Sequence, residues 1–135
     1  MSNLKNKIIM ITGASSGFGK ETAKMCVDLG AKVVLGARRE DKLADLCNEL
    51  GSDSAIYKAI DVTSKEQMHA LANYGIETFG RIDSLVNNAG VYGPKGKIEN
   101  INWLEWVKAI EINLFGSILM TRAVLPFFKK KYKGK

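Results

Sequence analysis

Short apolar runs alternate along the chain with longer segments in which apolar residues recur every three or four positions. The short runs, such as Lys32-Val33-Val34-Leu35-Gly36, are typical of strands buried on both faces of a parallel sheet. The longer segments have helical spacing, as for Leu43, Leu46 and Leu50. The predicted strands cover residues 7–12, 32–36, 55–60 and 82–86, and the predicted helices cover 17–29, 40–50, 64–79 and about 102 to 127 or 128.

Glycines and capping residues set the predicted ends of these helices. Gly30 and Gly51 follow the first two helices in the position of a C-terminal cap. Thr63 precedes Glu66 by three residues, which matches a capping box at the start of the third helix. The last helix is apolar on more than one face, so we expect another part of the protein to cover it.

This alternating order predicts an α/β fold in which helices cover both faces of a parallel sheet. Neither an internal repeat nor a linker divides the chain, so we expect residues 1–135 to form a single domain. The fold class is therefore a Rossmann-type, doubly wound sheet. We expect it to contain about four strands and four helices.

A glycine-rich turn, Thr12-Gly13-Ala14-Ser15-Ser16-Gly17-Phe18-Gly19, joins the first strand to the first helix. Such a turn binds phosphate, because the amide groups of the first helical turn have no partner within the helix. Gly13 permits the sharp turn, Gly17 leaves room for a pyrophosphate, and Gly19 lets the helix pack close to the strand. The spacing alone also fits an ordinary turn, and its place between strand and helix is what predicts nucleotide binding. The candidate cofactor residues here are Gly13, Ser15, Ser16, Gly17, Phe18 and Gly19.

Arg38 and Arg39 follow the second strand, where this architecture meets the adenosine ribose of a dinucleotide. An acidic residue there would accept from the 2′-hydroxyl of NAD, but the position holds the uncharged Ala37. Arg38 supplies a planar, bidentate donor suited to a 2′-phosphate. We therefore predict NADP rather than NAD as the cofactor; the alternative is an exposed arginine pair with no specific partner.

The end of the third strand carries a further candidate, Asp61-Val62. The Asp61 carboxylate is placed to accept a hydrogen bond from the adenine amino group. An aspartate at a helix entry is the competing interpretation, and the two roles are compatible.

These motifs, followed by Asn87-Asn88-Ala89-Gly90 and by Asn113 within Ile112-Asn113-Leu114, make the chain resemble the short-chain dehydrogenase/reductase family. The resemblance covers essentially all 135 residues. It implies that Asn88, Ala89 and Gly90 lie against the adenosine and ribose side of the cofactor and that Asn87 stabilises the central sheet. It also implies that the carbonyl of Asn113 holds a water in a proton relay. A polar residue that kinks a helix is the alternative for Asn113.

The resemblance further implies hydride transfer between a nicotinamide and a carbonyl or alcohol carbon. A tyrosine would act as general acid/base, a lysine four residues later would lower its pKa, and a serine would orient the substrate oxygen. The chain contains no such Tyr-x-x-x-Lys. The residues four positions after Tyr57, Tyr74 and Tyr92 are Asp61, Thr78 and Gly96, and Tyr132 has no residue at that spacing.

In the family this catalytic pair follows a fifth strand, so the resemblance implies that the Rossmann-type sheet of this chain is incomplete. We therefore expect a C-terminally truncated, cofactor-binding portion of an NADP(H)-dependent oxidoreductase, one that is a homo-oligomer when complete and acts on a small alcohol or carbonyl compound. The fourth strand and the last helix should then be exposed and adhesive. The alternative is a non-catalytic module that binds a nucleotide or another protein.

The composition fits a soluble globular protein, with 46% hydrophobic and 25% charged residues. The net charge of +6 comes mostly from five lysines among the last seven residues, which we interpret as a solvated tail rather than a nucleic-acid site. We expect no bilayer-spanning stretch and no signal peptide, and hence a cytoplasmic protein without a membrane partner. Cys26 and Cys47 fall on apolar helix faces as core thiols, and the single histidine, His69, predicts no metal site.

Overall fold

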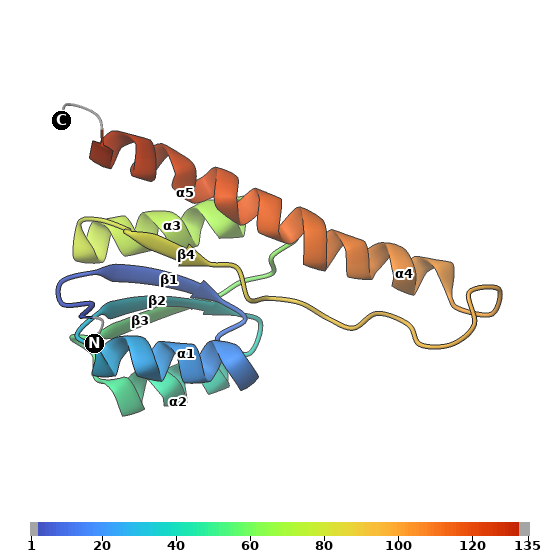
Figure 1. Cartoon of the computed structure of the whole chain (residues 1–135), viewed down its shortest axis with the longest axis horizontal. Coiled ribbons are helices and arrows are strands. Elements are labelled where there is room, and N and C mark those ends of the chain that lie inside the picture. Colours follow the sequence, from blue (N-terminus) through green and yellow to red (C-terminus); the bar gives the residue numbers. More distant parts are fainter. Residues whose placement is uncertain (1–2, 133–135) are drawn as a thin grey trace.

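The computed structural model describes residues 3–132, and it confirms the predicted parallel α/β fold. Helices α1 and α2 lie on one face of the sheet, and α3 and α5 lie on the other (Figure 1). The strands are β1 (Ile8–Thr12), β2 (Lys32–Ala37), β3 (Ala55–Ala59) and β4 (Ser84–Val86). The helical elements are α1 (Gly17–Asp28), α2 (Glu40–Leu50), α3 (Lys65–Phe79), α4 (Trp103–Ile110), the π-helical turn η1 (Glu111–Phe115) and α5 (Gly116–Tyr132).

The order of strands across the sheet is β3-β2-β1-β4. The chain runs outward from β1 to β3 and then crosses back to place β4 on the free side of β1, so that Ile9 lies between Val33 and Ser84. This reversal between β1 and β4 opens a crevice at the carboxyl ends of the strands, where open α/β sheets bind their ligands.

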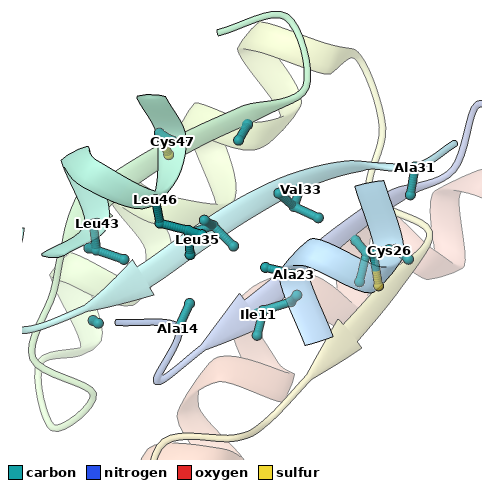
Figure 2. Close-up of a cluster of buried hydrophobic side chains, with 13 residues drawn as sticks. Ile11, Ala14, Ala23, Cys26, Ala31, Val33, Leu35, Leu43, Leu46 and Cys47 are labelled. Atoms are coloured by element: carbon teal, nitrogen blue, oxygen red, sulfur yellow. The ribbon is translucent and has the colours of Figure 1, made fainter. Parts of the chain in front are cut away.

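The core has two layers because helices cover both faces of the sheet. Figure 2 shows the layer under α1 and α2, in which Ile11, Val33 and Leu35 pack against side chains of the two helices. Cys26 of α1 and Cys47 of α2 lie in this layer as buried free thiols, which confirms the prediction of core thiols. Burial raises the pKa of Cys47 to about 11, because the apolar surroundings disfavour the thiolate.

The second layer lies under α3 and α5 and contains the fully buried Met68, Leu71, Met120 and Val124. Gly36 of β2 lets α3 approach the sheet, since a Cβ at this position would lie 2.6 Å from the Leu71 side chain. The carboxyl end of the sheet is thereby fixed from both faces.

The start of α3 differs from the predicted capping box. The N-cap is Ser64, whose hydroxyl oxygen accepts from the backbone N–H of Gln67 at 3.3 Å. Thr63 instead donates to the Asp61 carboxylate. The N-cap was predicted one residue too early, at Thr63, because Ser64 and Gln67 have the same kinds of side chain at the same spacing as Thr63 and Glu66.

The last predicted helix is continuous from Trp103 to Tyr132 but is not uniformly α-helical, because η1 interrupts it and Pro126 lies within α5. The predicted end at residue 127 or 128 was too early. Figure 1 shows α4 extending beyond the strand ends. The prediction of an incompletely covered apolar helix is confirmed by large exposed side chains at Trp103, Leu104, Ile110, Leu114, Phe115, Ile118 and Leu125.

The expectation that no stretch approaches the length of a membrane span was wrong. The helix from Trp103 to Lys130 is long and apolar enough to cross a bilayer by length and composition, with a mean hydropathy of 1.3 in its most apolar window. Core helices of soluble proteins pass the same test. In this fold α5 packs on the sheet layer through the buried Met120, Ala123 and Val124.

Candidate functional site

A cleft of about 820 Å³ lies at the carboxyl edge of the sheet, between the glycine-rich turn, the end of β2 and the segment after β4. Its size is in the usual range for small-molecule and cofactor sites. All the predicted cofactor residues line it except Gly19, and Asn113 lines it as well. Two further lining residues, Ile60 and Ile112, could not be predicted, because an apolar residue at the end of an element is indistinguishable by sequence from a core residue.

The glycine-rich turn is packed tightly against the segment after β4. Gly13 has a φ of +65°, and a Cβ there would lie 2.8 Å from the Cα of Ala89. Gly19 lies beneath the turn: its Cβ would come within 2.5 Å of the Asn88 amide nitrogen and closer still to the Gly13 carbonyl oxygen. This contact explains the absence of Gly19 from the cleft wall and agrees with its predicted role in helix packing.

Thr12 holds the two halves of the cleft together. The residue is buried, with only 1% of its surface exposed. Its hydroxyl oxygen accepts from the backbone N–H of Asn88 at 3.1 Å and from that of Ala89 at 3.2 Å. The Asn88 side chain donates to the Gly13 carbonyl at 3.0 Å. Sequence reasoning missed this role for Thr12; a threonine ending an otherwise apolar strand was the available signal.

The N-terminus of α1 is open toward the cleft. Its N-cap, Ser16, makes no side-chain capping hydrogen bond, and its first turn carries no acidic residue, unlike the first turns of α2, α3 and α4. Gly17 has a φ of +57°, and a Cβ there would meet no atom within 4 Å. The unpaired amides and the positive end of the helix dipole therefore face free space suited to an anion.

Asp61 lines the cleft opposite the turn with its carboxylate partly engaged. Its Oδ1 accepts from the backbone N–H of Thr63 at 2.9 Å and from the Thr63 hydroxyl at 2.7 Å. These two hydrogen bonds hold the pKa of Asp61 below its usual range, and the positive charges of Arg38 and Lys108 lower it further. The site therefore presents an ionised carboxylate at neutral pH. Within residues 3–132, Oδ2 has no hydrogen-bond partner.

We expect Thr63→Val to raise the pKa of Asp61 part of the way toward that of an ordinary aspartate, because the hydrogen bond from the Thr63 hydroxyl is lost while the backbone N–H of residue 63 still donates to Oδ1. A lowered carboxylate pKa stabilises the fold above the unfolded pKa of about 3.9 and loses that contribution as the pH falls through the folded value. The stability difference between the parent and Thr63→Val should thus be largest near neutrality and shrink below about pH 4. Carboxyl ¹³C NMR titration measures the pKa directly. An unchanged value in Thr63→Val would contradict the assignment.

The asparagines after β4 and in η1 fix the remaining wall. The Asn113 side chain accepts from the Val91 N–H at 2.8 Å and donates to the Val91 carbonyl at 2.7 Å. Its own carbonyl, which the resemblance assigned to a relay water, accepts from the Ser117 hydroxyl at 3.2 Å. Asn87 donates to Thr121 of α5 at 3.2 Å, so it joins the end of β4 to a helix rather than bonding within the sheet.

The motifs and fold have counterparts among known proteins. Residues 7–135 match the family model of the short chain dehydrogenases. The chain belongs to the short chain dehydrogenase family. It is 42% identical to an uncharacterized oxidoreductase of Staphylococcus saprophyticus, aligned over 99% of this chain and 54% of that protein. It is 40% identical to an uncharacterized oxidoreductase of Listeria monocytogenes, over 97% of this chain and 53% of that protein.

Solved structures agree with this family assignment. The 3-ketoacyl-(acyl-carrier-protein) reductase of Brucella melitensis, complexed with NADH, superposes with a TM-score of 0.92 at 35% identity, covering 96% of this chain and 52% of that one. The serine dehydrogenase of Escherichia coli gives a TM-score of 0.85 at 31% identity, covering 92% and 57%. The chain thus spans about half the length of the relatives that it matches.

Proposed function

We propose that this chain is the NADP(H)-binding domain of an oxidoreductase that transfers hydride between a nicotinamide and a small alcohol or carbonyl compound. The observation that carries the cofactor choice is the end of β2, where the uncharged Ala37 is followed by the exposed Arg38 and Arg39 at the cleft. An acidic residue at this position would repel a 2′-phosphate, whereas guanidinium groups bind one with two parallel hydrogen bonds. We also propose a cytoplasmic location and, for the whole protein, a homo-oligomer.

The residues present fit a dinucleotide. The amides at the start of α1 and the open space beside Gly17 would take the pyrophosphate. Oδ2 of Asp61 would accept from the adenine amino group, and Asn88, Ala89 and Gly90 would line the adenosine and ribose. When bound, the nicotinamide supplies or accepts the hydride.

This chain contributes cofactor binding and the position of the cleft wall, but no Tyr-x-x-x-Lys. Asn113 holds the peptide of Val91 beside the cleft and so orders the segment that follows the cofactor residues. Hydride transfer to a substrate is a property proposed for the whole protein, of which this chain spans about half the length of its relatives.

The cofactor named for the Brucella reductase structure is NADH, so the preference for NADP rests on residues of this chain. Two features support this preference: the arginine pair, and the absence of a carboxylate at position 37, which is Ala37.

Arg38→Ala is expected to weaken binding of NADPH by about tenfold or more, because a charge-assisted hydrogen bond contributes roughly 1.5–3 kcal/mol. Binding of NADH should change by less than about twofold, since NADH has no phosphate at that position. Titrating the fluorescence of each reduced cofactor measures both dissociation constants. Arg122→Ala is the matched control, because Arg122 is exposed on α5 and does not line the cleft. Equal losses for both cofactors would contradict the proposed phosphate contact.

A further inference from the structure

Gly116, the first residue of α5, is a glycine that the helix itself does not require. Its φ of −57° and ψ of −44° are ordinary right-handed helical values, which other residues adopt as readily. A glycine inside a continuous helix lowers stability relative to alanine, because it loses more backbone freedom on folding. Gly116 is also buried. The reason for a glycine here therefore lies in what packs against it.

The residue that packs against Gly116 is Val62, in the turn between β3 and α3. A Cβ on Gly116 would lie 2.9 Å from Cγ2 of Val62 and 3.1 Å from its Cβ. Carbon atoms in ordinary contact lie about 3.5–4.0 Å apart, so relief needs a shift of roughly 0.5 Å or more. Rotation of the valine side chain cannot remove the contact with its own Cβ. An added methyl group would therefore push the turn and the helix apart.

The turn around Val62 is a compact unit. Its hydrogen bonds stay within the turn or reach the start of α3, as when the Asp61 N–H donates to Gln67 at 2.7 Å. Within residues 3–132, no hydrogen bond joins the turn to α4, η1 or α5. The packing of Val62 on Gly116 therefore sets how near the whole turn lies to the long helix.

This turn also carries one wall of the cofactor cleft. Asp61 and Val62 both line the cleft, whereas Gly116 does not. In the proposed function, Oδ2 of Asp61 accepts from the adenine amino group. A binding group must be held within about 0.5 Å of its productive geometry, which is the size of the shift that a Cβ on Gly116 would cause.

We infer that Gly116 is a positioning residue of the cofactor site, which sets how close Asp61 comes to the adenine by seating Val62 against the helix. The inference rests on the proposed NADP(H) binding and deepens it. The preference for adenine as the base depends on a residue that does not line the cleft.

Gly116→Ala tests this inference through the choice of base. NADPH is compared with reduced nicotinamide hypoxanthine dinucleotide phosphate, in which a carbonyl oxygen replaces the adenine amino group and meets the Asp61 carboxylate. The parent should bind NADPH about tenfold or more tightly, as expected for one hydrogen bond to a charged group. In Gly116→Ala this ratio should fall below about threefold, because the hydrogen bond is misplaced. Isothermal titration calorimetry measures the dissociation constants, and far-UV circular dichroism checks that each variant is folded.

Val124→Ala is the matched control, since Val124 is fully buried on the same helix and does not line the cleft. It should lower the free energy of unfolding but keep the base ratio within about twofold of that of the parent, because the two sites are independent. Val62→Ala removes the same contact from the other side, and it should lower the ratio even if Gly116→Ala does not fold.

The outcomes separate this inference from the proposed function. If the parent binds neither dinucleotide, the proposed function fails and the inference with it. If the parent binds both equally, Asp61 does not select adenine, and the inference is overturned while NADP(H) binding stands. If the parent prefers NADPH but folded Gly116→Ala or Val62→Ala keeps the preference, or Val124→Ala loses it equally, only the role of Gly116 is overturned.

Discussion

Gly19→Ala is expected to destabilise the fold by about 3 kcal/mol or more, because the added methyl group has nowhere to go. Its Cβ would lie 2.5 Å from the Asn88 amide nitrogen and nearer still to the Gly13 carbonyl oxygen, both fixed to the sheet. Neither is the end of a flexible side chain that can turn away: the side chain of Asn88 is held by its bond to Gly13. Relief requires α1 to move off β1, which opens the core layer beneath it. Urea unfolding followed by far-UV circular dichroism measures the loss.

Gly17→Ala is the matched control, two residues earlier in the same turn. A Cβ there meets no protein atom, so the expected cost is only that of an alanine at a φ of +57°, about 1–2 kcal/mol. The two variants should separate further in cofactor binding. Gly17→Ala should remain folded and bind NADPH more weakly, since its methyl group occupies the space proposed for the pyrophosphate. Equal stability of the two variants would contradict the packing role assigned to Gly19.

Asn113→Leu is expected to release the segment after β4 and to destabilise the protein by about 2 kcal/mol. The side chain of Asn113 pairs with both the N–H and the carbonyl of Val91, and no other residue within 3–132 bonds to that peptide group. Residues 91–99 have no helix or strand of their own, so this pairing is their main attachment to the long helix. Limited proteolysis should therefore cut this segment at least several times faster in the variant. Binding of NADPH should weaken as well, because Val91 and Tyr92 line the cleft.

Asn113→Asp distinguishes the hydrogen bond that Asn113 donates from the one that it accepts. The aspartate can still accept from the Val91 N–H but places a second acceptor against the Val91 carbonyl. This variant should resemble Asn113→Leu in its rate of proteolysis at neutral pH and recover toward the parent when acid protonates the carboxylate. Proteolysis at the parental rate in both variants would show that the pairing does not hold the segment.

Residues whose function depends on local backbone geometry could be predicted from the sequence. The positive φ of Gly13 and Gly17, the close packing of Gly19 and the helix ends at Gly30 and Gly51 all follow from the special conformational freedom of glycine. The parallel sheet followed from apolar runs alternating with helical spacing. These features are encoded within a few residues of each other.

Features that depend on distant partners could not be predicted in this way. The Thr12 hydroxyl bonds to residues 76 and 77 positions away, and the Asn113 side chain to one 22 positions away. Nothing in the sequence near Asn113 marks the π-helical turn or the close approach of Gly116 to Val62. The start of α3 was misassigned for the opposite reason, since two neighbouring residue pairs offered equivalent caps.

The order β3-β2-β1-β4 also bears on how the chain acquires its site during folding. Strands β1, β2 and β3 pair with sequence neighbours, whereas β4 pairs with β1 across a separation of 75 residues, as between Ile9 and Ser84. Closing so long a loop is entropically unfavourable before the contacts form, so non-local pairings of this kind are slow steps in folding. The glycine-rich turn lies on one side of that pairing and the Asn88 segment on the other. The cofactor cleft is thus complete only after the most non-local contact of the sheet has formed, and a nucleotide that spans it stabilises that contact by mass action.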